Sequence, residues 1–277
     1  MSPDKAHQSL IREECILVAG WSPIEWGHFV VEFVPRILFL KYCLQRGIVP
    51  DAPIYISRIT PAFIVEAIGQ LLGELSSRIR FFEDKTLTLF ERAWIPPFLN
   101  FGGQLGYHPV VRALLETELQ PPTTLQGYGM DPSKPKLLYV SRQHKYYQSV
   151  VLSRSIVNED EVADVFISRH FEMVAMEEHD LLGKIRILAS ARVIAGGWGS
   201  GLLNTLLSSS SPLVISLGYG FNPAQFHVCD CTLQDYIELP TFDPANKTSP
   251  LWLIDGKSQY VNTTLLMNYL DKQLEAI

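Results

Sequence analysis

Three polar side chains on one face of an apolar helix are the first candidates for chemistry. His28, Glu32 and Arg36 recur every four residues, within a run that is otherwise almost entirely apolar. Buried polar groups must find hydrogen-bond partners or line a cavity. A carboxylate one turn from an imidazole would hold its tautomer and raise its basicity, so the pair predicts a general base. An internal salt bridge that docks the helix explains the spacing equally well.

A glycine-rich segment is the second candidate. The stretch 192–204 reads RVIAGGWGSGLLN, with four glycines within six residues. The β-branched run before the glycines predicts a strand, and the apolar pattern after them predicts a helix. Glycine lets the main chain approach a ligand closely, and the unpaired N–H groups at a helix start suit a phosphate or a carboxylate. Packing alone also explains small residues at such a turn, and the spacing matches neither G-x-G-x-x-G nor a Walker loop.

Ser141 and Arg142 end a predicted strand, where α/β proteins commonly bind ligands. A guanidinium at that point could hold a diphosphate through two hydrogen bonds. A basic and aromatic patch follows directly, consisting of His144, Lys145, Tyr146 and Tyr147. For Lys145 the simpler interpretation is a side chain on a solvated loop.

The acidic run 158–161, Asn-Glu-Asp-Glu, predicts the start of a helix rather than a catalytic site. Asn158 would cap the helix and Glu161 would reach back to it, as in a capping box. We assign these acids no catalytic role.

The elements that must position these residues alternate between strands and helices. We predict strands at 15–19, 53–57, 78–82, 86–90, 136–141, 171–175, 193–195, 213–217 and 251–254. We predict helices at 27–44 with an interruption at Pro35, and at 61–75, 109–119, 158–169, 179–191, from 201, near 223 and at 261–276. This alternation is typical of parallel sheets built from βαβ units.

A linker divides the chain. The stretch 120–136 contains four prolines, two glycines and no apolar periodicity. The 277 residues suffice for two cores. We therefore predict two domains, residues 1–125 and 126–277, with a ligand cleft between them at the carboxyl ends of their strands.

Composition narrows the class of protein. The net charge is −6 and no basic tract occurs, which argues against a nucleic-acid partner. The four cysteines are too few and too irregular for a disulfide framework and indicate a reducing compartment. The uncharged stretch 193–229 is broken by glycines, serines and prolines, so we expect no transmembrane segment. With a polar N-terminus, these features predict a cytoplasmic protein, either free or peripheral at the inner face of the membrane.

Taken in order, these segments resemble glycosyltransferase family 61, a group that includes bacterial capsular polysaccharide biosynthesis proteins. The first match is GHFVVEFVPR at 27–36, which is similar to the family's His-containing helix followed by Leu-Pro-Arg. The second is Ser141-Arg142 together with 154–162, which ends in NEDEV. The third is 189–194 followed by 196–204, which is similar to the family's G-x-H-G-A-G-L-x-N. The three pieces follow the family's order from about residue 16 to residue 217.

The resemblance implies a GT-B fold: two Rossmann-like domains facing across a cleft, with an acceptor-side N-terminal domain and a C-terminal domain that binds the nucleotide-sugar. It implies inverting transfer from a nucleotide-sugar, expected to be a UDP-sugar, to a hydroxyl of a glycan or polysaccharide acceptor. His28, assisted by Glu32, is the candidate base. The candidate nucleotide and diphosphate site comprises Arg142, Gly197, Trp198, Gly199, Ser200, Gly201 and Asn204. Further candidates are Arg36, Ser141, Arg154 and Ser216. No Asp-x-Asp motif is evident, so we expect transfer without a metal or a further cofactor.

Three features differ from the family pattern. Trp198 stands where the family has His, and Ser216 stands where an acid often contacts the nucleotide ribose. The spacer after Arg142 is a few residues longer, and only Arg154 remains of a usual Arg-Arg pair. A tryptophan at 198 could stack on a base or a sugar, indicate an unusual donor, or accompany a loss of activity.

Two alternatives to this activity stay open, and Trp198 and Ser216 motivate the first of them. One is a catalytically degenerate nucleotide-sugar-binding or assembly protein of the same fold. The other is a different α/β enzyme, such as a nucleotide-dependent oxidoreductase, against which the missing G-x-G-x-x-G argues.

Overall fold

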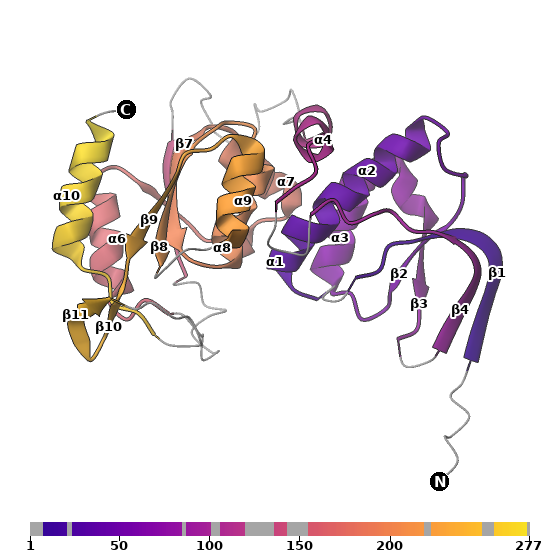
Figure 1. The fold of residues 1–277 in the computed structure, drawn as a ribbon, viewed down its shortest axis with the longest axis horizontal. Coiled ribbons are helices and arrows are strands. Elements are labelled where there is room, and N and C mark those ends of the chain that lie inside the picture. The colour runs from indigo at the N-terminus through magenta and orange to yellow at the C-terminus, as the bar shows by residue number, and fades with distance from the viewer. Residues whose placement is uncertain are drawn as a thin grey trace, which may run out of the picture. The chain divides into compact units, whose positions relative to one another are not determined.

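A computed structural model describes residues 8–20, 24–84, 87–100, 106–119, 136–142, 155–218, 223–250 and 258–275. The chain divides into two compact units. The first unit is Met1–Gly103 with Tyr107–Leu119, and the second is Gln104–Gly106 with Gln120–Ile277. Each unit has its own parallel sheet with helices packed on it (Figure 1), which confirms the predicted α/β class.

The sheet of the first unit has four parallel strands in the order β3-β2-β1-β4. Their bounds are β1 (Gln8–Leu17), β2 (Ile54–Ser57), β3 (Ile79–Phe82) and β4 (Leu87–Trp94). The chain order reverses between β1 and β4, so the carboxyl ends of these two strands form a topological switch point, where α/β sheets bind ligands. All four predicted strands are confirmed, although β1 and β4 are longer than predicted.

The long helical segment of the first unit is continuous through Pro35. It consists of α1 (Trp26–His28), a π-helical turn η1 (Phe29–Phe33) and α2 (Val34–Gln45). The N–H of Val34 donates to the carbonyl of Phe29, five residues back, which is the π-helical bond. Pro35 therefore lies at the start of α2, where its missing N–H is tolerated. The predicted interruption is wrong, because the extra residue of the π turn accommodates the proline.

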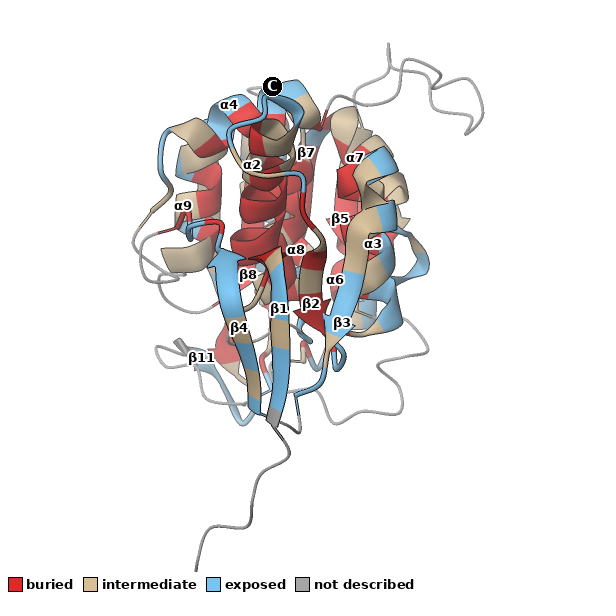
Figure 2. Cartoon of the chain, turned by 90° about the vertical axis from the view of Figure 1, so that its right-hand side faces the viewer, coloured by how far each residue is buried: buried red, intermediate tan, exposed pale blue. Residues whose placement is uncertain are grey.

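The helix α2 forms much of the first unit's core. It packs against α3 (Ala62–Leu72) and α4 (Val110–Glu118), and most of its side chains are buried, as the red colour in Figure 2 shows. The helix α3 continues into the 3₁₀ turn η2 (Gly73–Arg78) rather than ending at 75. Because most of α2 is buried, a polar side chain on this helical segment must find hydrogen-bond partners inside the fold or at the end of the segment.

The second unit contains five parallel strands in the order β6-β5-β7-β8-β9. They are β5 (Lys136–Val140), β6 (Glu172–Val174), β7 (Ala191–Gly197), β8 (Leu213–Gly218) and β9 (Tyr236–Pro240). This is the 2-1-3-4-5 order of flavodoxin-like sheets, in which the switch point falls between the first and third strands. Here those strands are β5 and β7.

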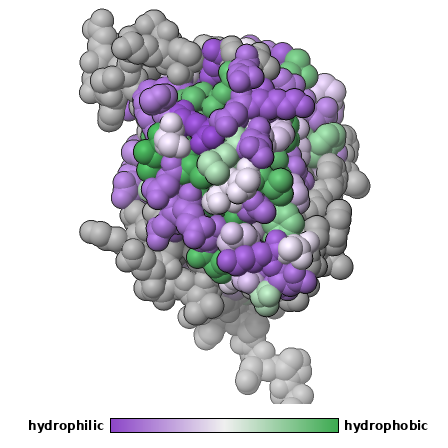
Figure 3. All heavy atoms as spheres, turned by 90° about the vertical axis from the view of Figure 1, so that its left-hand side faces the viewer, coloured by the Kyte–Doolittle hydropathy of each residue, from purple (hydrophilic) through white to green (hydrophobic). Residues whose placement is uncertain are grey.

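Helices cover both faces of this sheet. On one face, α6 (Glu159–Ile167) and α10 (Thr263–Leu274) bury an apolar core against side chains of β5, β7 and β8. The other helical elements are η4 (Met176–Glu178), α7 (Leu181–Ala189), α8 (Ser200–Leu203), η5 (Asn204–Leu207) and α9 (Pro223–Thr232). The outward surface on the α6 and α10 side is largely hydrophilic with scattered apolar residues (Figure 3), as expected for a solvated face.

Several predictions for the second unit need correction. The strand β7 runs through Gly196 and Gly197, and the helix expected from 201 is a four-residue α8 followed by a 3₁₀ turn. The strand β9 and the antiparallel pair β10 (Phe242–Asp243) and β11 (Asn246–Pro250) were not predicted. The predicted strand at 251–254 lies outside the described residues.

The predicted capping box at the start of α6 is also wrong. Asn158 makes no side-chain cap. Instead its amide donates to the carbonyl of Val261 and its oxygen accepts from the N–H of Val261. Glu161 accepts from the Asn158 side chain at 3.1 Å. The side chain of Asn158 therefore ties α6 to the segment that leads into α10.

Candidate functional site

Two candidate segments meet at the switch point of the second unit. Ser141 and Arg142 directly follow β5, and Trp198 directly follows β7. The strands β5 and β7 are neighbours, paired in register from Leu137 with Val193 to Val140 with Gly196. The arginine and the glycine turn, which lie more than 50 residues apart in sequence, are thus brought to the same edge of the sheet.

The guanidinium of Arg142 lies directly over the turn. Its Nη2 donates to the carbonyl of Trp198 at 2.8 Å. Gly199 has φ +146° and ψ −169°, a conformation that favours glycine. A Cβ atom at Gly199 would lie only 1.9 Å from Nη2 of Arg142. The absence of a side chain at 199 is therefore what allows the guanidinium to rest against the backbone.

The backbone amides at the start of α8 directly follow this glycine turn in the chain. The carbonyl of Gly199 accepts from the amides of Leu202 and Leu203, and the amide of Trp198 donates to the carbonyl of Leu217. The amides between these, at Gly199, Ser200 and Gly201, belong to the first turn, where a helix provides no internal acceptor. Because α8 has only four residues, its dipole is small, and the positive charge at this edge comes mainly from Arg142.

The buried side chain of Asn204 hydrogen-bonds to the backbone of this turn. It is 1% exposed, and its side-chain amide donates to the carbonyls of Ser200 at 3.2 Å and Gly201 at 2.8 Å. The structure thus places this candidate inside the fold, where it shapes the turn.

A Cβ at Gly197 would make only ordinary contacts, 3.4 Å from Ile156 Cδ1 and 4.0 Å from Arg142 Nε.

Sequence reasoning gave Glu159 no role in the site, yet its carboxylate anchors the end of β5. Its Oε1 accepts from the backbone N–H of Arg142 at 2.7 Å and from the hydroxyl of Ser141 at 3.2 Å. Ser141 is itself 6% exposed. The only sequence signal is an acid at the first position of a helix, and by itself that pattern indicates helix capping rather than a contact with β5.

Ser216 does not lie at the edge of the sheet. It is fully buried inside β8, where it pairs with Gly196 and Glu238. The neighbouring strand β9 carries a carboxylate, that of Glu238, at the position that pairs with Ser216. A Cβ at Gly218 would lie 3.1 Å from Oε1 of Glu238 and 3.4 Å from Cβ of Trp198. The hydroxyl of Ser216 would lie 3.6 Å from the same Cβ, so Glu238, Trp198 and Ser216 all border Gly218 at the end of β8.

The Glu238 carboxylate also contacts the neighbouring Tyr236. Its Oε2 accepts from the phenol of Tyr236 at 3.2 Å. Burial, together with the Glu238 carboxylate, raises the pKa of Tyr236, so the phenol stays protonated and donates.

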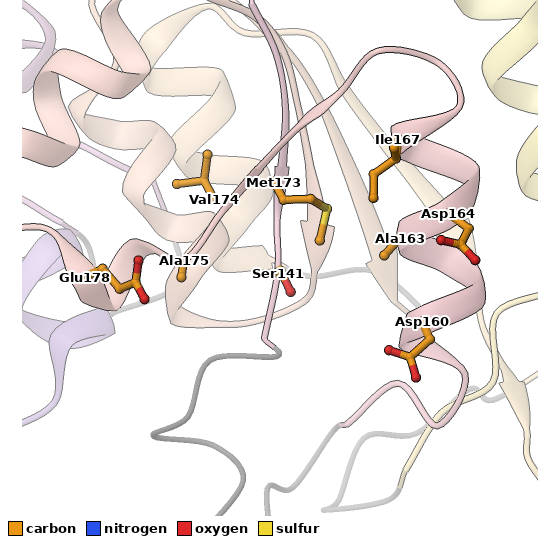
Figure 4. A pocket seen from close by; sticks show the side chains of 9 residues that line it. All are labelled: Ser141, Asp160, Ala163, Asp164, Ile167, Met173, Val174, Ala175 and Glu178. Atoms are coloured by element: carbon orange, nitrogen blue, oxygen red, sulfur yellow. The ribbon is translucent and has the colours of Figure 1, made fainter. Parts of the chain in front are cut away.

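A pocket of about 450 Å³ lies on the other side of β5, between α6 and the segment from β6 to η4. Figure 4 shows Asp160 and Asp164 on α6 and Glu178 on the opposite wall, with Met173 and Val174 between them. Three carboxylates would repel a diphosphate. An anionic ligand is therefore favoured at the β5–β7 edge, next to Arg142, and not in this pocket.

In the first unit the structure brings His28 and Glu32 together. Nδ1 of His28 lies 2.7 Å from Oε1 of Glu32, and Nε2 lies 3.4 Å from a carboxylate oxygen of Glu25. The Glu32 side chain is 7% exposed, whereas that of His28 is 35% exposed. The buried Glu32 carboxylate can thus hold the Nδ1 proton, while Nε2 faces the exposed carboxylate of Glu25.

Arg36 connects the two strand ends at the switch point of the first unit. Nε and Nη2 donate to the carbonyl of Pro96 at 3.2 and 3.0 Å, and Nη1 donates to the carbonyl of Ala19 at 2.7 Å. The side chain is fully buried, with the rings of Phe33 and Phe98 at 5.5 and 4.1 Å. Burial lowers the pKa of Arg36 to about 10, although Glu32 opposes this shift, so the guanidinium stays charged at neutral pH.

The sequence was compared with known protein families and with curated proteins. The model of the family described as Glycosyltransferase 61 matches residues 26–215, about two thirds of the chain. The chain belongs to glycosyltransferase family 61. Membership implies a glycosyltransferase that takes a sugar from a nucleotide-sugar donor and passes it to a glycan acceptor. The comparison with curated proteins found no match.

The matched range contains both candidate segments of this glycosyltransferase. His28, Glu32 and Arg36 lie in its first part, and Arg142 and the glycine turn in its last part. Ser216 and Glu238 lie beyond residue 215, so the Glu238 carboxylate in β9 belongs to the part of the chain outside the family match.

Some candidates of this family 61 chain lie outside the described residues. They are Arg154 and the patch at His144, Lys145, Tyr146 and Tyr147. Among the residues that the structure does describe, no group of three or more His, Cys, Asp or Glu side chains is arranged to hold a metal ion. Within the same ranges, none of the helices has the length and apolar composition needed to cross a membrane.

Proposed function

We propose that this protein is an inverting glycosyltransferase that transfers a sugar from a UDP-sugar to a hydroxyl group of a glycan or polysaccharide acceptor. In this proposal the first unit is the acceptor-side domain and the second unit binds the nucleotide-sugar, in a GT-B arrangement. The observation that carries the proposal is the guanidinium of Arg142 resting on Gly199 at the β5–β7 switch point.

The diphosphate of the donor would bind at this edge. Arg142 supplies a fixed positive charge, and the amides of Ser200 and Gly201 supply donors in a first helical turn. As the bond to the sugar breaks, negative charge develops on the departing diphosphate, and preorganised donors of this kind stabilise it. Because Arg142 can provide this charge, we propose that transfer needs no metal ion.

The nucleoside end of the donor has two candidate contacts. Trp198 offers an aromatic surface on which a base or a sugar can stack. Glu238 in β9, which borders Gly218 as Trp198 does, offers a carboxylate that can accept from sugar hydroxyls. The carboxylate that the sequence lacks at position 216 would then come from the adjacent strand.

Inversion requires a base that removes the proton from the acceptor hydroxyl during a single displacement. We propose His28 for this role, through Nε2, with Glu32 holding the Nδ1 proton. His28 and Glu32 lie four residues apart and contact each other, and the greater exposure of His28 fits a group that meets substrate. Arg36, which is fully buried, positions the strand ends instead of contacting substrate.

The test of the donor site is a binding titration with UDP in the wild type and in Arg142→Ala. Loss of a charged hydrogen bond should weaken binding by about 1.5–3 kcal/mol. Arg192→Ala is the matched control, because Arg192 is exposed at the amino end of β7. Equal UDP affinity in Arg142→Ala and the wild type would remove Arg142 from the site.

Thermal melts with UDP, GDP and CMP, with and without EDTA and Mn²⁺, would identify the donor class and test independence from metal.

The proposed general base is tested by measuring the rate of sugar transfer by the His28→Ala variant. Removal of a general base should lower kcat by roughly 10²- to 10⁴-fold while UDP affinity stays unchanged. Normal transfer by the variant would refute the assignment.

The alternative is a nucleotide-sugar-binding protein of the same family that has lost catalysis, and Trp198 in place of the family's His favours it. A wild type that binds UDP-sugars but neither transfers nor hydrolyses any of them would support this alternative.

A further inference from the structure

Glu159 sits where three donors from the end of β5 converge. Its Oε1 lies 2.7 Å from the backbone nitrogen of Arg142, 3.2 Å from the Ser141 hydroxyl and 3.5 Å from the Tyr139 hydroxyl. Glu159 is the first residue of α6, and its carboxylate reaches across to Ser141, which lies 18 residues earlier in the chain, directly after the end of β5. One side chain thus ties a helix start to the strand end that carries the proposed diphosphate ligand.

The charges around this carboxylate favour the arrangement. A negative side chain in the first turn of a helix is stabilised by the unpaired N–H groups there. Tyr139 is fully buried, and burial followed by the Glu159 charge raises its pKa well above the usual value, so it remains a donor. A charge-assisted bond to a backbone N–H is shorter and stronger than a neutral one.

This contact fixes the main chain of Arg142, not its guanidinium. With the backbone N–H of Arg142 held by Glu159, the side chain extends to the carbonyl of Trp198 and lies against Gly199. Ser141 is restrained further, because its own N–H donates to the carbonyl of Val174 in β6. Both neighbours of β5 therefore contribute to the placement of one arginine.

We infer that Glu159 is a positioning residue for nucleotide binding, acting through the main chain of Arg142. The inference rests on the proposed function, in which Arg142 holds the donor diphosphate. It differs from a purely structural role because the effect of Glu159 on affinity must disappear when the Arg142 side chain is absent.

A double-mutant cycle tests this. The dissociation constants of UDP and of inorganic pyrophosphate are measured for wild type, Glu159→Ala, Arg142→Ala and the double variant, with unfolding followed separately. Glu159→Ala should weaken both ligands about tenfold in the wild-type background and less than about twofold in the Arg142→Ala background, since coupled residues are not additive. Glu159→Gln, which keeps an oxygen acceptor, should recover part of the loss and provides a folded variant if Glu159→Ala is unstable.

Glu161→Ala is the matched control, because Glu161 lies in the same turn of α6, is exposed, and contacts only Asn158 among the described side-chain hydrogen bonds. It should bind both ligands as the wild type does. Two results would overturn the inference: unchanged affinity in both Glu159 variants, or an equal loss from Glu159→Ala with and without Arg142. If Arg142→Ala itself binds normally, the proposed diphosphate site fails, and the inference about Glu159 fails with it.

Discussion

The substitution Gly199→Ala tests the proposed donor site at its tightest contact. The new Cβ would lie 1.9 Å from Nη2 of Arg142, far inside van der Waals contact, and the neighbouring atom belongs to the very group proposed to bind the diphosphate. The guanidinium must therefore move, and its 2.8 Å bond to the carbonyl of Trp198 must break. The backbone also carries strain, because an alanine at φ +146° adopts a conformation that glycine alone tolerates well.

Both effects have an estimable size. Backbone strain of this kind costs about 1–3 kcal/mol, which should appear as a lower free energy of unfolding. Displacement of Arg142 removes a charged hydrogen bond to the diphosphate, worth about 1.5–3 kcal/mol. UDP should therefore bind roughly 10- to 150-fold more weakly to Gly199→Ala than to the wild type.

Isothermal titration with UDP measures the affinity, and urea unfolding measures the stability. Gly197→Ala is the control within the same segment, because its Cβ would meet atoms only at 3.4 and 4.0 Å, in ordinary contact. The control should keep wild-type affinity. If Gly199→Ala binds UDP as tightly as Gly197→Ala does, then the position of the Arg142 guanidinium is irrelevant to the donor, and the reasoning is refuted.

Three further substitutions test other parts of the structure. Arg36→Lys should lower the free energy of unfolding by about 2–4 kcal/mol, since an ammonium cannot reproduce the three bonds to the carbonyls of Ala19 and Pro96; a loss below about 1 kcal/mol in urea unfolding would contradict this. Burial lowers the pKa of Lys184 to about 8, so the folded state releases its proton before the unfolded state does. The stability of the wild type relative to Lys184→Met should therefore rise between pH 8 and 10.5, by up to about 3 kcal/mol, and a difference that stays flat across this range would exclude the shift. Glu238→Gln should weaken UDP about tenfold and leave pyrophosphate unaffected, because its proposed contact is with the nucleoside part; equal losses for the two ligands would show that it acts through the shape of the turn.

Sequence patterns predicted most of the strands and helices because the buried strands are short apolar runs between polar breaks. The predictions failed where one residue type, glycine or proline, is compatible with two different local structures. Gly196 and Gly197 indicated a turn, yet both lie in β7, where a Cβ at Gly196 would come within 3.1 Å of Val140. Close packing against β5, rather than a bend in the chain, explains the glycine there. Pro35 indicated a helix break, yet a π turn accommodates it.

The candidate site was predictable in its charges but not in their partners. The contact between His28 and Glu32 followed from helical spacing alone. The bonds of Arg36 could not be predicted, because its acceptors are backbone carbonyls 17 and 60 residues away, and a carbonyl has no sequence signature. Glu159 and Glu238 were missed for a related reason: each acts across a strand pairing or a helix start that only the topology defines.

The two arginines show how one arrangement can serve different purposes. Arg36 bonds to the carbonyls of Ala19 and Pro96, just beyond β1 and β4, and Arg142 bonds from the end of β5 to Trp198, just beyond β7. Each guanidinium thus connects two neighbouring strand ends at a switch point. Arg36 is fully buried and its charge is met by carbonyls and aromatic rings, so it can only hold the chain together. Arg142 is only partly buried, and its guanidinium lies against a residue without a side chain. Because of this physical difference we propose Arg142, and not Arg36, as the ligand of the donor diphosphate.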